Sequence, residues 1–71
     1  MEQTLRAEMV ASVHSVVVEV GDEVVVGDTL VILESMKMEI PVVVEAPGVV
    51  TEISVAAGDV IREGDVIAIL I

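Results

Sequence analysis

The residue best suited to covalent chemistry in this sequence is Lys37, the only lysine among its 71 residues. It lies near the middle of the chain in the segment Glu34–Glu39, which reads ESMKME. An amine that a modifying enzyme acylates must be exposed, accessible and easily told apart from other amines. A single lysine in an acidic chain meets the last requirement, so the sequence favours covalent attachment of a cofactor at Lys37.

The neighbours of this lysine are candidates for recognition. Methionine side chains are long, flexible and polarizable, and apolar side chains at an exposed tip usually have a contact partner. Met36 and Met38 each suit a protein core, but their position on both sides of one lysine disfavours joint burial. The carboxylates of Glu34 and Glu39 are either solvated flanks of a hairpin or charges that a ligase recognises, and Glu34 is the stronger candidate.

The elements that position Lys37 come from a duplication, because the second half of the chain repeats the first at an offset of 37 residues. Gly21-Asp22 aligns with Gly58-Asp59, and Gly27-Asp28 aligns with Gly64-Asp65, without a gap. Glycine supplies the positive φ of tight turns, and aspartate bonds to its nearby backbone. The pattern predicts an all-β flattened barrel or sandwich of about eight short strands, with quasi-two-fold symmetry and a single domain over residues 1–71.

The alignment of the halves also separates inner from outer valines. Four valines of the first half align with apolar residues and are expected to face inward: Val13, Val16, Val18 and Val24. Three others align with Ser54, Arg62 and Glu63 and are expected to face outward: Val17, Val25 and Val26. These outer valines are either scattered surface residues or a docking patch.

The segment Glu34–Glu39 joins the two copies and is the only run without strong β character. It follows the apolar segment 30–33 and precedes the segment 40–44. Approximate two-fold symmetry relates this connection to the chain ends. We therefore expect Lys37 to project from one end of the domain, with both termini at the opposite end.

Charge and composition exclude several classes of function. A net charge of −10 and the absence of aromatic residues disfavour binding of nucleic acid or of an anionic membrane surface. No cysteine is present, and the single histidine, His14, is expected to face solvent and not to bind a metal. No nucleophile–base pair is visible, so we expect no catalytic residues. The first residues lack a secretory signal pattern, which makes the cytoplasm the default location.

The segment Glu34–Glu39 resembles the attachment hairpin of biotinyl domains, the biotin carboxyl carrier family. The resemblance extends over roughly residues 7–71 and includes both Gly-Asp turn pairs and the Ala46-Pro47-Gly48 opening of the second half. It is strongest for the short, free-standing members of the family. Three features depart from the common pattern: Ser35 replaces alanine, the opening at 7–11 lacks both prolines and the glycine, and no room exists for an inserted thumb loop.

The resemblance implies biotin in amide linkage on Lys37, attached by a biotin protein ligase. It further implies a swinging arm that carries CO2 between a biotin carboxylase and a carboxyltransferase, with no catalytic residue in the domain itself. Lipoyl domains share the fold but typically have aspartate before and alanine after the lysine, so Met36 and Met38 favour biotin. Two alternatives remain: a lipoyl carrier, or an unmodified β module that binds a partner through its valines.

Overall fold

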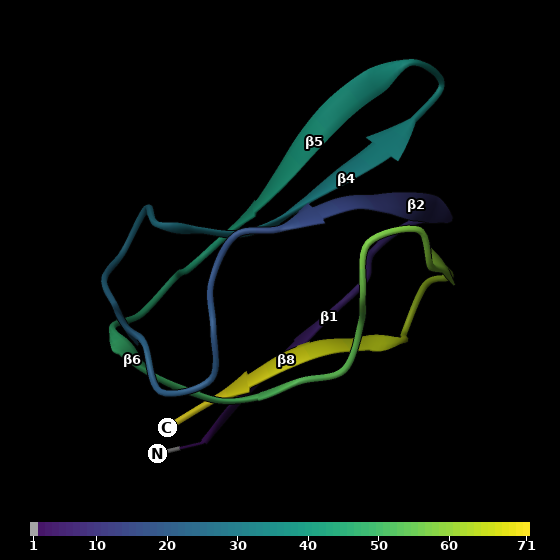
Figure 1. Ribbon diagram of the computed structural model, residues 1–71. Helices are drawn as coiled ribbons and strands as arrows, with labels where there is room; N and C mark the ends of the chain where they lie inside the picture. The colour runs from purple at the N-terminus through teal and green to yellow at the C-terminus, as the bar shows by residue number, and fades with distance from the viewer. Residues whose placement is uncertain (1) are drawn as a thin grey trace.

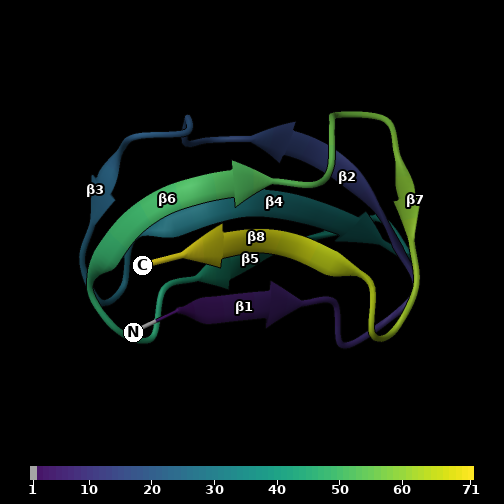
Figure 2. The ribbon, with the colours of Figure 1, turned by 90° about the horizontal axis from the view of Figure 1, so that it is seen from below.

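The valine-rich segments form eight strands in two four-stranded antiparallel sheets. The computed structural model describes residues 2–71, and the two sheets form a flattened sandwich (Figures 1 and 2). The expected all-β fold is confirmed. The sheet orders are β1-β8-β6-β3 and β5-β4-β2-β7. The strands are β1 (Gln3–Arg6), β2 (Ala11–Val16), β3 (Glu23–Val24), β4 (Thr29–Ser35), β5 (Met38–Val43), β6 (Gly48–Ile53), β7 (Val60–Ile61) and β8 (Val66–Leu70).

The duplication in the sequence is a duplication in space. Adding 37 to the residue numbers of β1–β4 gives the positions of β5–β8. Each strand of one sheet therefore has its counterpart in the other sheet, and the order β1-β8-β6-β3 corresponds to β5-β4-β2-β7. The shifts in strand register are also related by the offset of 37 residues. The register of β2 and β4 shifts between Val13 and Ser15, and that of β6 and β8 shifts between Val50 and Glu52. The quasi-two-fold symmetry is therefore confirmed down to the bulges.

The Gly-Asp pairs form the turns that the sequence predicts. Gly21 has a φ of 98°, and the Asp22 Oδ2 atom accepts a hydrogen bond from the Glu19 N–H at 2.9 Å. An Asp side chain that closes a turn in this way leaves the glycine to adopt the left-handed conformation. The other three turns repeat the arrangement, since Asp28 accepts from Val25, Asp59 from Ala56 and Asp65 from Arg62.

These turns also hold the two halves together. The Val13 N–H donates to the Asp59 carbonyl at 2.8 Å, and the Val50 N–H donates to the Asp22 carbonyl at 2.9 Å. Each of the four turns thus satisfies backbone groups of the other copy, either in a strand or at the residue that directly follows one. Buried backbone groups need such partners, so neither half completes its own hydrogen bonding and the two copies must fold as one unit.

The core lies between the sheets and is built entirely from aliphatic side chains. Val13 and Val24 are buried, and Val16 and Val18 are partly buried against the core, as predicted. Much of the core consists of residues related by the duplication, such as Leu30 with Ile67 and Leu33 with Leu70. The buried set is Ala7, Ala11, Val13, Val24, Leu30, Val31, Leu33, Val44, Val50, Ile61, Ile67, Ala68 and Leu70.

The outward valines are exposed as predicted, and the second copy shows that the fold does not require them. Val17, Val25 and Val26 are exposed, and their counterparts in the other half are the exposed polar residues Ser54, Arg62 and Glu63. The same backbone thus accepts either set of side chains.

Replacing the valine pair by its counterparts tests this conclusion. We expect the double variant Val25→Arg/Val26→Glu to change the free energy of unfolding by less than about 0.5 kcal/mol, because neither side chain packs in the core. Urea denaturation of the variant and the wild type provides the measurement. A loss of 2 kcal/mol or more, which is on the order of a core truncation, would show that the two valines stabilise the fold.

Two further features of the chain connections matter for the site. The link from Val16 to Glu23 is as long as the link from Ile53 to Val60, so the first half contains no thumb insertion. Within residues 2–71, no helix has the length and apolar character that crossing a membrane requires.

Candidate functional site

Lys37 lies at the tip of the β4–β5 hairpin, which projects from the body of the sandwich (Figure 1). The two chain ends lie together at the opposite end of the molecule, as the symmetry argument predicts (Figure 1). The strands reach closer to the lysine than expected, since β4 ends at Ser35 and β5 begins at Met38. Ser35 pairs with Met38, which leaves Met36 and Lys37 as a two-residue turn.

The turn that presents Lys37 is strained. Met36 has a φ of 52° and Lys37 a φ of 64°, the positive values that a type I′ hairpin turn requires at both central positions. Asn-Gly usually fills these positions, because the left-handed conformation costs a residue with an ordinary Cβ roughly 1–2 kcal/mol. No sequence pattern predicts this feature, since Met-Lys is not a turn signature. The paired ladder of β4 and β5 must hold the turn in place.

Relief of this strain is a testable consequence. We expect the double variant Met36→Asn/Lys37→Gly to raise the free energy of unfolding by about 1 kcal/mol, because both new residues tolerate positive φ. Chemical denaturation provides the measurement. Met36→Ala serves as the control, since it removes the exposed thioether but keeps a Cβ, and it should stay within about 0.5 kcal/mol of the wild type. Equal stability of the double variant and the wild type would contradict a strained tip.

The methionines beside the lysine are surface residues. Met36 is 91% exposed and Met38 is 64% exposed, and Lys37 is exposed as well. The alternative of joint burial is therefore wrong. The tip offers an amine between two apolar, polarizable side chains, and a surface of this kind suits contact with another molecule.

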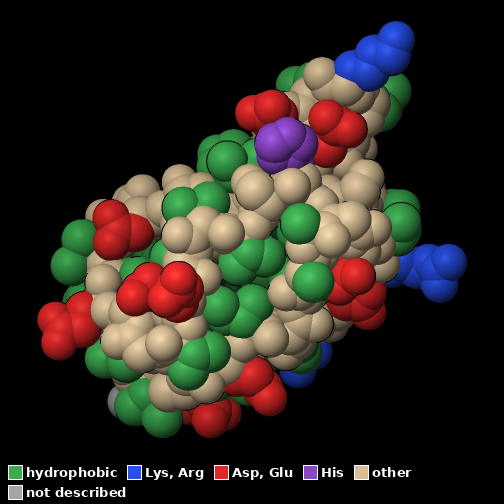
Figure 3. Space-filling view, viewed as in Figure 1, with side chains coloured by type: hydrophobic (Ala, Val, Ile, Leu, Met, Phe, Trp, Pro, Cys, Tyr) green, Lys and Arg blue, Asp and Glu red, His purple; other side chains and the backbone are tan. Residues whose placement is uncertain are grey.

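The acidic flanks of the hairpin lie opposite each other. Glu34 pairs with Glu39 in the register of β4 and β5, and both are exposed. Like charges directly opposite on neighbouring strands are destabilising, so fold stability does not account for the pair. Figure 3 shows acidic side chains and the single histidine below the cationic tip.

His14 is exposed, as predicted, but the structure gives it a neighbour that the sequence did not indicate. Its Nε2 atom lies 3.9 Å from the Glu39 Oε2 atom. The two residues come from different copies of the repeat, and they meet because β2 and β5 both flank β4. Among residues 2–71, no group of three or more His, Cys, Asp or Glu side chains is arranged to hold a metal ion.

The sequence and the fold of this chain are similar to those of known proteins. The family model Biotin_lipoyl, described as "Biotin-requiring enzyme", matches residues 3–70. The urea carboxylase of Kluyveromyces lactis contains a region that matches all of this chain at 32% identity with a TM-score of 0.92. A single-chain, multi-domain long-chain acyl-CoA carboxylase matches 96% of this chain at 29% identity with a TM-score of 0.89.

A lipoyl domain is also similar. The lipoyl domain of the 2-oxoglutarate dehydrogenase complex from Azotobacter vinelandii matches 87% of this chain at 27% identity, with a TM-score of 0.76, and 78% of that domain is covered. By contrast, the chain spans only 6% of the urea carboxylase and 7% of the acyl-CoA carboxylase. Among curated protein sequences, none matches significantly.

The family model covers nearly the whole chain, and the solved structures that match share both the fold and 27–32% of the sequence. Domains of this kind are carriers and not catalysts, and in the two carboxylases the matching region is a small part of a much longer chain. The protein belongs to the family of biotin/lipoyl attachment domains.

Proposed function

We propose that this domain is a biotin carrier whose cofactor is joined by an amide bond to the Nζ atom of Lys37. One observation carries the proposal: the only lysine of the chain lies at the tip of a projecting hairpin, between two exposed methionines. Lys37 is exposed, and a primary amine in open solvent fits the requirements of an acylation site.

The chemistry of attachment determines what the chain must provide. The Nζ atom attacks the carbonyl carbon of biotinyl-adenylate, a C–N bond forms, AMP leaves and the amine loses a proton. Because the amine loses a proton in this step, a base is needed, and the ligase must supply it. The domain contributes exposure and position, and the exposed Glu34 and Glu39 beside the lysine are charges that a ligase can recognise.

Once attached, biotin supplies a ureido ring that takes up and releases a carboxyl group. The domain transports this ring between a biotin carboxylase and a carboxyltransferase. The hairpin suits transport, because its tip stands clear of the body and lies at the end opposite the chain termini (Figure 1). Contacts of Met36 and Met38 with the partner enzymes then orient the arm, since these side chains have no place in the core.

Biotin is favoured over lipoate by two observations. Methionine stands on both sides of Lys37, whereas lipoyl domains typically have aspartate and alanine there. The matches to the two carboxylases also have higher TM-scores, 0.92 and 0.89, than the match to the lipoyl domain, 0.76. We also propose that the chain forms a single domain over residues 1–71, that it is located in the cytoplasm and that it has a carboxylase as a partner.

Measurement of the intact mass tests directly which group is attached to Lys37. The purified chain is incubated with ATP and either biotin plus a biotin protein ligase or lipoate plus a lipoate ligase. We expect one biotinyl increment in the first reaction, none in the second, and none for Lys37→Arg in either. A lipoyl increment alone would favour the second candidate. An unmodified wild-type chain in both reactions would contradict both carriers and leave a module that only binds a partner.

A further inference from the structure

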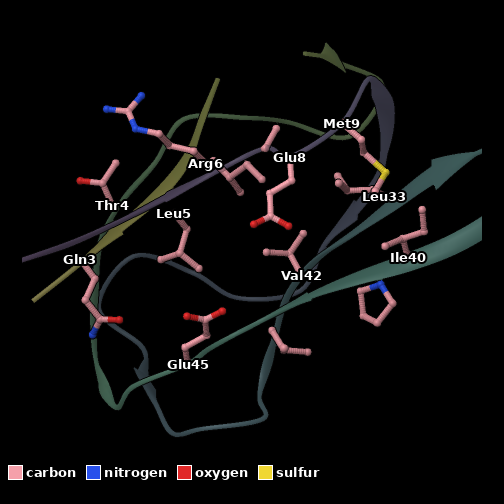
Figure 4. A pocket seen from close by; sticks show the side chains of 14 residues that line it. Gln3, Thr4, Leu5, Arg6, Glu8, Met9, Leu33, Ile40, Val42 and Glu45 are labelled. Atoms are coloured by element: carbon pink, nitrogen blue, oxygen red, sulfur yellow. The ribbon is translucent and has the colours of Figure 1, made fainter. Parts of the chain in front are cut away.

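A groove opens on the side of the sandwich where two edge strands face each other. The strand β1 pairs only with β8, and β5 pairs only with β4, so each sheet has a free edge on this side. The cavity between them has a volume of about 360 Å³, within the range of roughly 300–1,000 Å³ that small-molecule sites occupy. Figure 4 shows Leu5 and Val42 on opposite walls of this groove.

The end of the groove nearest the hairpin is apolar. Met9, Leu33 and Ile40 lie close together there (Figure 4). Ile40 and Met38 point to the same face of β5, because side chains two residues apart on a strand share a face. An apolar strip therefore runs from the exposed Met38 near the tip, through the half-buried Ile40, into the groove.

This strip is within reach of a group attached to Lys37. Ile40 lies three positions after Lys37 in the chain, a distance of roughly 10 Å when the backbone is extended. A biotinylated lysine has roughly ten bonds between its Cα atom and the fused rings, which corresponds to about 12 Å when extended. A group of this length on Lys37 can therefore reach Ile40, which lines the apolar end of the groove.

The groove also contains polar partners for a urea. The Glu8 side chain lies between Leu5 and Met9 in the groove, and Glu45, its counterpart in the second copy, lies toward the other end (Figure 4). Carboxylates form strong, charge-assisted hydrogen bonds with N–H donors. The apolar walls therefore suit the sulfur-containing ring and methylene chain of biotin, and Glu8 suits the ureido N–H groups.

Other occupants fit this groove less well. A β-strand added to β5 would meet Pro41, which has no N–H to donate. A second copy of the chain would bring together two molecules that each carry a net charge of −10. Within residues 2–71 no thumb loop extends over the hairpin, and this groove is an apolar concave surface within reach of the tethered group.

We propose that the biotinyl group on Lys37 folds back along β5 and rests in the groove between β1 and β5, with Met9 and Ile40 against its rings. The inference rests on the proposed function, because it takes biotin as the cargo. A short tether gives an effective concentration on the order of 1 mM. A site with a dissociation constant near 1 mM is then about half filled by the tethered group, and it still releases the group to a partner enzyme.

The test compares three forms of the protein: unmodified, acetylated on Lys37 and biotinylated on Lys37. Both modified forms are made with activated esters, so the test does not depend on recognition by a ligase. Lys37→Arg treated with the biotin ester shows the effect of biotin on the chain's α-amino group alone. The methyl groups of Met9 and Ile40 are observed by carbon–proton NMR. We expect both resonances to move in the biotinylated form and not in the acetylated form, with nuclear Overhauser contacts from the biotin rings to Met9.

Two matched variants then distinguish binding in the groove from contact with the surface near it. Met9→Glu introduces a charge at the mouth of the groove, and Val10→Glu introduces the same charge at an exposed neighbouring residue that does not line it. We expect the shift of Ile40 on biotinylation to fall to the acetylated level in Met9→Glu and to persist in Val10→Glu. Identical Met9 and Ile40 resonances in the biotinylated and acetylated wild type would overturn the inference. A ligase that fails to biotinylate Lys37 would contradict only the proposed function.

Discussion

Exchanging Met36 and Lys37, so that the turn reads Lys-Met, is expected to reduce the rate of enzymatic biotinylation at least ~100-fold while the domain stays folded. The variant keeps the composition, the charge and the single lysine of the chain. It moves the amine to the other turn position and places Ser35, instead of a methionine, directly before the lysine. Misplacement of a reacting group by about 1 Å can cost 10²-fold in rate, and adjacent turn positions point their side chains in different directions.

The time course of biotin incorporation with catalytic amounts of ligase measures this effect. A denaturation curve for the variant serves as the control, and we expect it to match the wild type because the turn keeps two Cβ-bearing residues. Met38→Ala is a second control, since it changes the apolar flank and leaves the lysine in place. Equal rates for the exchanged and wild-type chains would show that the ligase needs only an accessible lysine in this hairpin, and the strained turn would then have no role in presentation.

Truncation of the core is expected to have the largest effect on stability. Leu30 and Ile67 are fully buried and occupy equivalent positions in the two copies. Their replacement by alanine should each cost about 2–5 kcal/mol, the usual range for a buried aliphatic side chain. A domain of this length has a total stability of roughly 4–10 kcal/mol, so either variant should lose a large part of its folded population. The midpoint of urea denaturation provides the measurement.

The symmetry of the fold supplies the control for this prediction. Because the copies share one core and bond to each other's turns, Leu30→Ala and Ile67→Ala should lower stability by similar amounts and each should unfold in a single transition. Val20→Ala, at an exposed position, should change stability by less than about 0.5 kcal/mol. Two separate transitions in either core variant would contradict a single cooperative unit.

The rigidity of this body bears on its function. A carrier must keep its attachment point in a defined place while the attached group moves. The ladder of β4 and β5 supports the tip, and the crossed bonds between the copies support the ladder. We therefore expect motion to be confined to the Lys37 side chain and the group proposed to be attached to it. In the proposed resting position, the groove between β1 and β5 limits that motion further.

The sequence by itself determined the features that depend on local chemistry. Gly-Asp pairs select tight turns, alternating valines select strands, and the repeat at 37 residues requires two equivalent halves, so the all-β fold and its symmetry were predictable. The exposed end position of Lys37 followed from that symmetry. Composition also singled out Lys37, because a chain with one lysine offers one amine to a ligase.

Other features were decided only by the tertiary structure, because they join residues far apart in the chain or depend on backbone angles. Met36 and Lys37 adopt positive φ because the pairing of β4 with β5 leaves room for only two residues in the turn. His14 meets Glu39 because β4 lies between their strands. The groove exists because the symmetry leaves β1 and β5 unpaired on the same side, a consequence of sheet order that no local pattern encodes.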